Sequence, residues 1–330
     1  MRYWFVVFLL GLNFALQAQP KIIIHAAVLQ NQNYVVGAAN APTGLFRYEG
    51  DTLWTHLGWR NARTFGIAVN PANPDYIFLA CGNGALRSLD GGASWRITTD
   101  WRMTEVLDVV MDPFDSNQVF IATAYGIWRS LDRGNSWIAA NQGLKSNFVQ
   151  TIEPDRRRAK RWLAGTEDGL FQTIDSGTSW QKIGPEQIAV RDIHCCAEKP
   201  GYWIVGIEDK GVLVSSDDGN TWRAGIGDIA KQTIYAVAID PSYPNRMAAG
   251  GYQSGVWVSR DGGRSWAASK QKLPALDIHA LAFDPGISGR LWVGTLGAGI
   301  YYSDDLGLNW TYAGLNGTDI WDIHIIKGAR

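Results

Sequence analysis

The chain has 330 residues, of which 30 are basic and 31 acidic, so its formal net charge is −1. This length suits one large all-β domain or two small ones, and the balanced charge excludes the basic face that a nucleic-acid partner normally requires. Glycine (37 residues) and tryptophan (16 residues) are abundant, which suits many short strands joined by tight turns.

The chain begins with a segment typical of a secretory signal. Arg2 precedes an apolar run over residues 4–12, and the small residue Ala18 suits a cleavage site. The run is too short for a comfortable membrane anchor, and no cysteine follows it that would indicate a lipoprotein. We therefore expect residues 1–18 to be a signal peptide and the mature protein, 19–330, to be secreted or periplasmic without a membrane span.

Tryptophan recurs at a nearly constant interval along the rest of the chain. The spacings are 41, 42, 43, 42, 44 and 44 residues, between Trp54, Trp95, Trp137, Trp180, Trp222, Trp266 and Trp310. A period of about 40–50 residues is the mark of a propeller or solenoid. In the best-formed repeat, residues 278–283, 291–295 and 299–302 predict three strands, and a short fourth follows Trp310. Seven repeats of four antiparallel strands predict an all-β fold, a seven-bladed β-propeller that fills residues 19–330 as one domain.

The last six of these tryptophans each close an eight-residue turn with Ser or Thr, Asp and Gly at fixed places, as in residues 88–95. We expect the aspartate to accept backbone N–H bonds within its own turn. The glycine two residues later can take a positive φ without steric cost. The six aspartates to which we assign this structural role are Asp90, Asp132, Asp175, Asp217, Asp261 and Asp305.

The pattern S/T-x-D-x-G-x-S/T-W resembles the Asp-box, or BNR repeat, over about residues 40–315. Sialidases, family 74 xyloglucanases, sortilin-type receptors and the photosystem II assembly factors of the Ycf48/HCF136 type share this repeat, and the last group is the most similar in build. The resemblance implies the propeller but no particular activity. The sialidase arginine triad has no match in the predicted inner strands. The T-D-x-G-G loop of the xyloglucanases corresponds to residues 40–44, which carry no carboxylate.

The first repeat departs from the pattern, because Gly50 stands where the aspartate is expected and the turn before Trp54 is one residue shorter. Two segments compete to complete this blade. Residues 22–29 can pair with 34–39, and residues 318–326 also look like an inner strand. We expect one of the two to close the ring; the alternative is that 318–326 begins a further repeat.

The inner strands show columns of large and small residues, which would let facing blades pack closely. The large column holds Phe65, Leu107, Phe148, Tyr235 and His279, and the small column holds Gly66, Asp108, Val149, Cys195, Ala236 and Ala280. His194 and His324 also fit the large column. We interpret these as core histidines, because no ligand pair with metal-binding spacing exists, and we expect no metal or cofactor. Cys195 and Cys196 should point to opposite faces of a strand as buried free thiols.

Candidate site residues lie in the loops that join the second strand to the third and one blade to the next. These loops share one side of a propeller, the loop face, and there we expect five aromatic residues to bind a partner: Trp59, Trp101, Tyr125, Tyr252 and Trp321. Four carboxylates on neighbouring blades would suit glycoside hydrolysis if the chain were an enzyme: Glu167, Asp168, Glu208 and Asp209. Acidic residues are common at turn tips, so we expect no catalysis.

The one cluster of like charges, Arg156, Arg157, Arg158, Lys160 and Arg161, lies on the opposite face. It is a solvated hairpin or, alternatively, a docking patch for an anion. The sequence as a whole favours a non-enzymatic, exported scaffold that binds a protein partner through its loop face. The alternative is a glycan-binding protein or glycoside hydrolase of the Asp-box group. Nucleic acid is not an expected partner.

Overall fold

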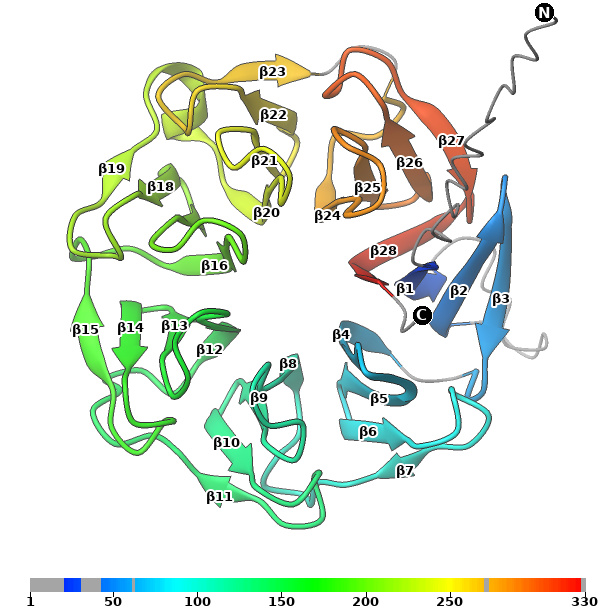
Figure 1. The fold of residues 1–330 in the computed structure, drawn as a ribbon, viewed down its shortest axis with the longest axis vertical. Coiled ribbons are helices and arrows are strands. Elements are labelled where there is room, and N and C mark those ends of the chain that lie inside the picture. The colour runs from blue at the N-terminus through cyan, green and yellow to red at the C-terminus, as the bar shows by residue number, and fades with distance from the viewer. Residues whose placement is uncertain (1–20, 31–42, 61–62, 270–272, 328–330) are drawn as a thin grey trace, which may run out of the picture.

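The computed structural model describes residues 21–30, 43–60, 63–269 and 273–327. Seven four-stranded antiparallel sheets form a ring, which confirms the predicted seven-bladed β-propeller (Figure 1). Within the described ranges the single helical element is a short 3-10 turn, η1 (Gly227–Lys231), and no helix there is long and apolar enough to cross a membrane. The expected signal peptide lies outside the described residues.

Each blade runs from the centre of the ring to its edge in four strands. The innermost strands of blades 1 to 7 are β28 (Thr318–Lys327), β4 (Thr64–Asn70), β8 (Val106–Met111), β12 (Val149–Pro154), β16 (Val190–Cys195), β20 (Ile234–Ile239) and β24 (Ile278–Phe283). The second strands are β1 (Ile22–Gln30), β5 (Asn73–Cys81), β9 (Val119–Thr123), β13 (Trp162–Thr166), β17 (Trp203–Ile207), β21 (Met247–Gly251) and β25 (Leu291–Thr295).

The outer half of each blade is shorter. The third strands are β2 (Gly44–Gly50), β6 (Gly84–Ser88), β10 (Gly126–Ser130), β14 (Gly169–Thr173), β18 (Gly211–Ser215), β22 (Gly255–Ser259) and β26 (Ile300–Ser303). The outermost strands are β3 (Leu53–Leu57), β7 (Arg96–Ile97), β11 (Ile138–Ala139), β15 (Gln181–Ile183), β19 (Arg223–Ala224), β23 (Ala267–Ser269) and β27 (Thr311–Gly314). The second strands are almost wholly buried and the outermost largely exposed, so the hydrophobic core lies towards the middle of each blade.

Both chain ends build blade 1, which corrects the expectation that only one of two segments closes the ring. β28 takes the innermost place and β1 the second, and the two pair antiparallel from Ile22 opposite Lys327 to Gln30 opposite Thr318. β1 then pairs directly with β2 rather than with residues 34–39, which lie outside the described residues. This arrangement gives β1 a hydrogen-bonded neighbour on each side, so neither edge of β1 is left unpaired.

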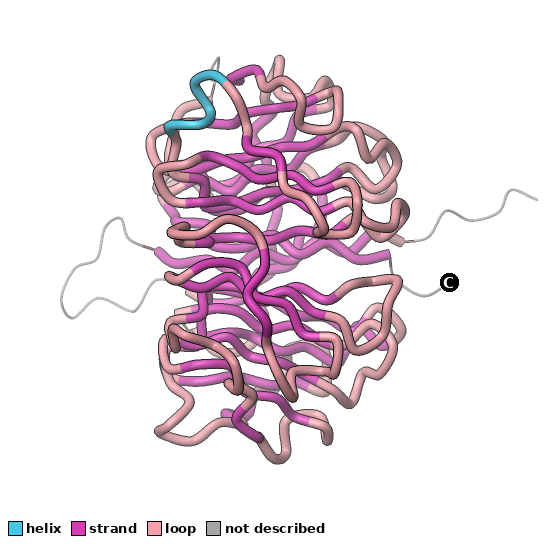
Figure 2. Tube along the Cα trace, turned by 90° about the vertical axis from the view of Figure 1, so that its left-hand side faces the viewer, coloured by secondary structure: helices cyan, strands magenta, loops and turns pink. Residues whose placement is uncertain are grey.

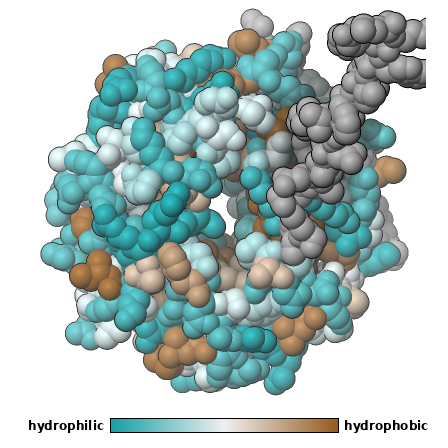
Figure 3. Space-filling model, in the orientation of Figure 1, coloured by the Kyte–Doolittle hydropathy of each residue, from teal (hydrophilic) through white to brown (hydrophobic). Residues whose placement is uncertain are grey.

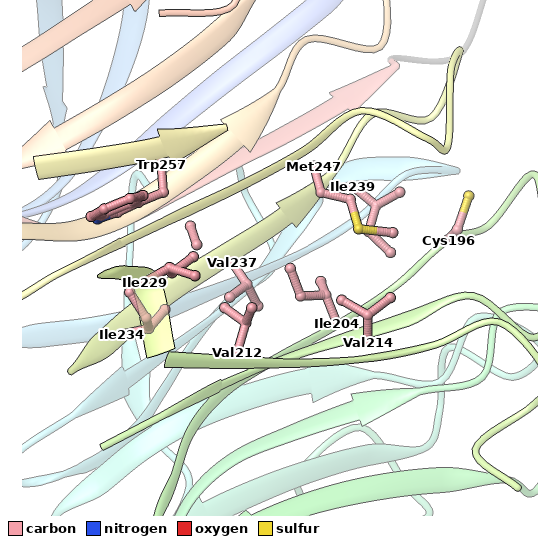
Figure 4. Close-up of a cluster of buried hydrophobic side chains, with 11 residues drawn as sticks. Cys196, Ile204, Val212, Val214, Ile229, Ile234, Val237, Ile239, Met247 and Trp257 are labelled. Atoms are coloured by element: carbon pink, nitrogen blue, oxygen red, sulfur yellow. The ribbon is translucent and has the colours of Figure 1, made fainter. Parts of the chain in front are cut away.

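The blades are held together by hydrophobic clusters between neighbouring sheets. One such cluster joins blades 5 and 6, where Ile204, Val212 and Val214 meet Val237 and other apolar residues of the next blade (Figure 4). Cys196 belongs to this cluster, whereas Cys195 packs in the cluster between blades 4 and 5. The two thiols therefore point to opposite faces, and all three cysteines are buried and free, as predicted.

The turns between the third and fourth strands repeat one set of hydrogen bonds. In blade 5, Asp217 Oδ1 accepts the hydroxyl of Ser215 and the backbone N–H of Thr221 at 2.9 Å each, and its Oδ2 accepts the Thr221 hydroxyl at 2.6 Å. Gly219 in this turn has φ +80°. Equivalent bonds form around Asp90, Asp132, Asp175, Asp261 and Asp305. The carboxylates thus bind their own turns at the rim of the ring.

Several tryptophans of these turns also tie one blade to the one before it. Trp137 Nε1 donates to the carbonyl of Thr98 at 2.9 Å, and Trp180 Nε1 donates to Ala140 at 2.8 Å. In blade 1, which lacks the aspartate, Trp54 Nε1 donates to Ala313 of blade 7 at 2.7 Å. Blade 1 therefore makes a closing contact at its outer edge as well as at its centre.

Candidate functional site

A β-bulge in every innermost strand forms the mouth of the central channel. In each blade the register between the first and second strands skips one residue of the inner strand, for example Leu107 between Val106 and Asp108. The seven skipped residues are Phe65, Leu107, Gln150, Arg191, Tyr235, His279 and Trp321. A bulge re-aims the side chain of its extra residue. This ring lies at the strand ends nearest the loop face, because each inner strand starts there.

The bulges also correct the predicted inner-strand columns. Gln150, not Phe148, takes the bulged position of blade 4. Thr151 and Asp192 take the following position, where Val149 and Cys195 were expected. His194 and His324 do not belong to the large column, because Arg191 and Trp321 take the bulged positions of blades 5 and 1. The expected residues take these positions in blades 2, 3, 6 and 7.

Four bulged residues form an aromatic arc across blades 6, 7, 1 and 2, and they are Tyr235, His279, Trp321 and Phe65. Tyr235 and His279 stack with ring centroids 4.5 Å apart, and Trp321 meets His279 at 4.7 Å and Phe65 at 5.4 Å, both edge-on. Burial lowers the pKa of His279 to about 4, although the charge of Asp277 opposes this, so the ring is neutral near pH 7. The arc thus lines one side of the channel mouth with uncharged aromatic rings.

Next to the Tyr235 end of this arc, Arg191 holds two of the carboxylates that the sequence singled out. Its Nη1 donates to Glu167 Oε1 at 2.7 Å, and its Nη2 donates to Glu208 Oε2. The structure therefore brings Glu167 of blade 4 and Glu208 of blade 5 together, but around a shared guanidinium. The guanidinium group of Arg191 thus lies between the two carboxylates, whereas in a glycoside hydrolase the two carboxyl groups flank the scissile bond of the substrate.

The other two carboxylates of that set face different partners. Lys182 Nζ lies 3.4 Å from Asp168 Oδ2, and the Thr233 hydroxyl donates to Asp209 Oδ1 at 2.7 Å. The backbone N–H of Asp209 also donates to Thr233 Oγ1 at 3.1 Å, so Asp209 is bound to the connection that leads into blade 6. The four residues thus do not converge on one point.

Four of the five predicted aromatic anchors are exposed. Trp101 is 83% exposed, Tyr252 56%, Tyr125 53% and Trp59 46%. Tyr125 and Tyr252 lie in turns between second and third strands, and the two tryptophans lie in connections between blades, so all four belong to the loop face. η1 marks this face at the left of Figure 2. Trp321 differs from them because it is partly buried within the aromatic arc.

Inside the channel, three aspartates on alternate blades bridge to the next blade. Asp108 Oδ2 accepts the backbone N–H of Ile152 at 2.9 Å, Asp192 Oδ2 that of Val237 at 2.7 Å, and Asp322 Oδ2 that of Ile67 at 2.8 Å. Burial raises the pKa of all three, that of Asp322 to about 7, with the charge of Asp108 contributing to the rise at Asp192 and Asp322. The sequence analysis assigned these aspartates no function.

A second level of polar residues lies nearer the opposite face. Glu153 Oε1 accepts the backbone N–H of Cys195 at 3.4 Å, and His194 Nδ1 accepts that of Ile239 at 3.3 Å, so each again bridges to the next blade. His324 stands directly across from His25 in the β1–β28 ladder. Burial lowers the pKa of both His194 and His324 to about 3. The described residues contain no group of three or more His, Cys, Asp or Glu side chains that could hold a metal ion.

The cluster over residues 156–161 carries less free charge than the sequence indicated. Arg161 is only 5% exposed and donates to Asp155 at 3.0 Å and Asp218 at 2.6 Å, and Arg158 also pairs with Asp218. Arg156 lies 3.6 Å from Glu153 of the channel wall, and Arg157 lies 3.7 Å from Glu198. Four of the five cations are thus paired with carboxylates, which does not suit the alternative of a docking patch for an anion.

Figure 3 shows this opposite face of the ring. Hydrophilic residues cover most of it, hydrophobic residues are scattered over it in small groups, and the centre of the ring is open. Where described residues form this side, no broad apolar surface gathers that would indicate a protein interface.

The fold and the channel place the chain in the class of seven-bladed β-propellers. No family model and no curated protein matches it. Among solved structures, a GH74 enzyme from Niastella koreensis has a TM-score of 0.68 and 18% identity over 83% of this chain and 51% of its own. YCF48 from Cyanidioschyzon merolae has a TM-score of 0.59 and 16% identity over 78% of this chain and 89% of its own. YCF48 bound to D1 peptide has a TM-score of 0.56 and 18% identity over 76% and 81%.

These similarities agree with the resemblance inferred from the sequence and establish the architecture. They include both GH74 enzymes and YCF48, and at such identities they show the fold alone. The chain spans about half the length of the Niastella enzyme and 38% of an ancestral GH74 enzyme, whereas it spans most of the length of YCF48.

Proposed function

We propose that the protein is an exported, non-enzymatic propeller that binds a protein partner through its loop face. The observation that carries this proposal is the exposure of Trp101, Tyr125 and Tyr252 on that face, at 83%, 53% and 56%. They come from separate blades and serve no strand packing. Large exposed aromatic side chains are the residues that most often dominate the energy of a protein interface.

The arrangement of the carboxylates supports the absence of catalysis. Glu167 and Glu208 share Arg191, and Asp168 and Asp209 have partners of their own. A hydrolase needs an acid and a base that face a common substrate position. We therefore expect the purified mature chain not to hydrolyse sialosides or β-glucans. Turnover that disappears when Glu167 or Glu208 is changed to Gln would contradict the proposal.

The binding surface is tested by capture of a partner from the native envelope fraction on immobilised mature protein. Trp101→Ala and Tyr252→Ala should weaken capture at least tenfold while the melting temperature stays nearly unchanged, because truncation of such anchors costs about 2 kcal/mol or more. Trp180→Ala is the matched control, since this buried tryptophan donates to Ala140 of the preceding blade. It should lower the melting temperature and leave capture by the folded fraction intact. Unaltered capture by both loop-face variants, Trp101→Ala and Tyr252→Ala, would refute the loop face as the binding surface.

A glycan is the second candidate ligand, and the aromatic arc is the observation that favours it. Tyr235, His279 and Trp321 offer flat apolar faces next to the Arg191 cluster, and sugars stack on such faces. On a glycan array, binding that is lost with Trp321→Ala and retained with Trp101→Ala would favour this candidate over the protein partner.

A further inference from the structure

A cleft of about 320 Å³ lies on the outer side of the ring, between blades 2 and 3. One wall is formed by Arg87 and by residues 96–100, 102 and 103, and the other by residues 134–137 of the blade 3 turn. The hydrogen bond of 2.9 Å from Trp137 Nε1 to the Thr98 carbonyl joins the two walls. The cleft therefore has fixed sides and reaches from the blade-to-blade connection on the loop face along the outer strands.

The cleft is cationic in a protein whose formal net charge is −1. Arg87, Arg96 and Arg102 line it, and Asp100 is its single acidic residue. Arg102 engages that carboxylate through both Nε and Nη2, at 3.2 and 2.6 Å. Two guanidinium groups, those of Arg87 and Arg96, remain without a carboxylate in the cleft.

These two arginines stand directly opposite each other in the β6–β7 ladder. Like charges in this position destabilise a sheet. The same ladder position in blades 3 and 5 pairs an arginine with an apolar residue, Arg129 with Ile138 and Val214 with Arg223. No other arginine pair occurs in the registers of the described strands. An anion held between the two guanidinium groups would turn this unfavourable pair into a favourable site.

The geometry leaves Arg87 and Arg96 available to such an anion. Arg87 Nη1 donates to Asn135 Oδ1 at 3.0 Å and to the Arg133 carbonyl, which are both neutral acceptors that fix its position. Arg96 is exposed and makes no ion pair within the described part of the chain. A guanidinium group presents a planar fork of donors that matches a carboxylate.

Trp101 is next to the cleft along the chain and supplies an apolar side chain, although it is not one of the lining residues. It is 83% exposed and stands between Asp100 and Arg102, which both line the cleft. A free small anion would not use this side chain. A peptide segment with an apolar residue beside its carboxylate would use both the tryptophan and the arginines.

We propose that this cleft binds an acidic side chain of the protein partner, with Arg87 and Arg96 holding the carboxylate and Trp101 covering an adjacent apolar residue. This inference rests on the proposed function and specifies the chemistry of the partner: an acidic segment with an apolar neighbour. Binding through such contacts should weaken as the salt concentration rises, because exposed charges are screened.

The test uses a fluorescein-labelled peptide of sequence Gly-Leu-Trp-Glu-Asp-Glu-Gly and its amide analogue, in which Gln and Asn replace the acids. Fluorescence anisotropy should show the acidic peptide binding to the wild-type chain at least tenfold more tightly than the amide peptide. Arg96→Thr and Arg87→Thr should each weaken binding of the acidic peptide about tenfold. Arg223→Thr, at the position of blade 5 that corresponds to Arg96, is the matched control and should leave it unchanged within twofold.

A stability measurement accompanies the binding assay. Arg96→Thr should keep or raise the melting temperature, because it removes the like-charge pair, whereas a purely structural arginine would lower it. The inference is overturned if the acidic peptide fails to bind, or if the amide peptide binds equally well. It is also overturned if inorganic phosphate competes fully and Trp101→Ala has no effect, which would define a small-anion site.

Capture of the native partner by two variants distinguishes a failure of this inference from a failure of the proposed function. If Tyr252→Ala abolishes capture while the double variant Arg87→Thr/Arg96→Thr captures normally, the loop face stands and the cleft is refuted. If the double variant and Tyr252→Ala both weaken capture, both proposals are supported. If neither does, both fail.

Discussion

Replacing Glu153 by Gln should make the protein more stable at alkaline pH and leave it unchanged in acid. Glu153 is 7% exposed on β12, and burial raises its pKa from the ordinary 4.5 to about 7, with the Arg156 charge opposing the rise. The folded protein thus binds the proton more tightly than the unfolded chain does. The stability associated with this group is fully present below about pH 4.5 and is lost as the pH rises through about 7.

The size of the stability gain follows from the difference between the pKa of Glu153 in the folded protein and its ordinary pKa in the unfolded chain. A separation of about 2.5 corresponds to at most about 3 kcal/mol in the free energy of unfolding. Gln keeps the oxygen that accepts the Cys195 N–H but carries no charge. At pH 8 the variant should therefore gain up to about 3 kcal/mol over the wild type, and at pH 4.5 the two should agree.

Urea unfolding followed by tryptophan fluorescence at pH 4.5, 6 and 8 measures this difference. The comparison is made between variant and wild type at each pH, because buried histidines such as His194 titrate in the opposite direction. Glu198→Gln is the control, since the Glu198 side chain is 66% exposed. A difference between Glu153→Gln and the wild type that stays constant from pH 4.5 to 8 would refute the argument.

Three further predictions address the turns and the closure of the ring. Asp217→Ala should lower the melting temperature without loss of partner capture, because three bonds within one turn depend on that carboxylate; an unchanged melting temperature with lost capture would contradict the structural role. Burial lowers the pKa of His25 to about 4, so the folded state favours the neutral ring, and stability is lost as the pH falls below about 6.5. His25→Leu should therefore gain about 2 kcal/mol over the wild type at pH 5 relative to pH 8 in the same urea assay, and equal gains at both pH values would refute this. A chain that ends at residue 317 lacks β28 and exposes the inner edge of β1, so size-exclusion chromatography should show self-association where the full chain elutes as a single smaller species.

The number of blades and the strand order within them could be predicted from the sequence, because each repeat carries the same tryptophan and the same turn. The bulges were not predicted, although the sequence contains a pattern that indicates them. Val106 and Val109, or Ile278 and Leu281, are buried or packed core residues three positions apart. A regular strand would place two such residues on opposite faces. An apolar spacing of three within a short strand therefore indicates a bulge between the two residues.

The ion pairs between the 156–161 cluster and the next blade could not have been predicted. Asp218, which pairs with Arg161 and Arg158, lies 57 residues beyond Arg161 in the turn of the next blade. Sequence patterns reveal charges that are neighbours along the chain, whereas a propeller brings together loops one full repeat apart. The same reason hid the contact of Arg191 with Glu167, which are 24 residues apart on adjacent blades.

The channel aspartates follow from the geometry of seven bulges in a closed ring. Asp108, Asp192 and Asp322 each directly follow a bulge, and each accepts a backbone N–H of the neighbouring inner strand, at the junctions that follow blades 3, 5 and 1. The charge of Asp108 raises the pKa of both Asp192 and Asp322, so carboxylates on adjacent blades would be less favourable than carboxylates on alternate blades.

Small or neutral residues stand between the aspartates. Gly66 precedes Asp108 in the ring, and a Cβ at that glycine would lie 3.3 Å from Asp108 Oδ1, so the missing side chain makes room for the carboxylate. Because the ring has seven blades, an odd number, aspartates cannot alternate with small or neutral residues all the way around it. The alternation fails between blades 6 and 7, where Ala236 and Ala280 occupy the two successive positions. Replacing either alanine by Asp would place a fourth buried carboxylate next to an existing one, which the electrostatics of the channel disfavour.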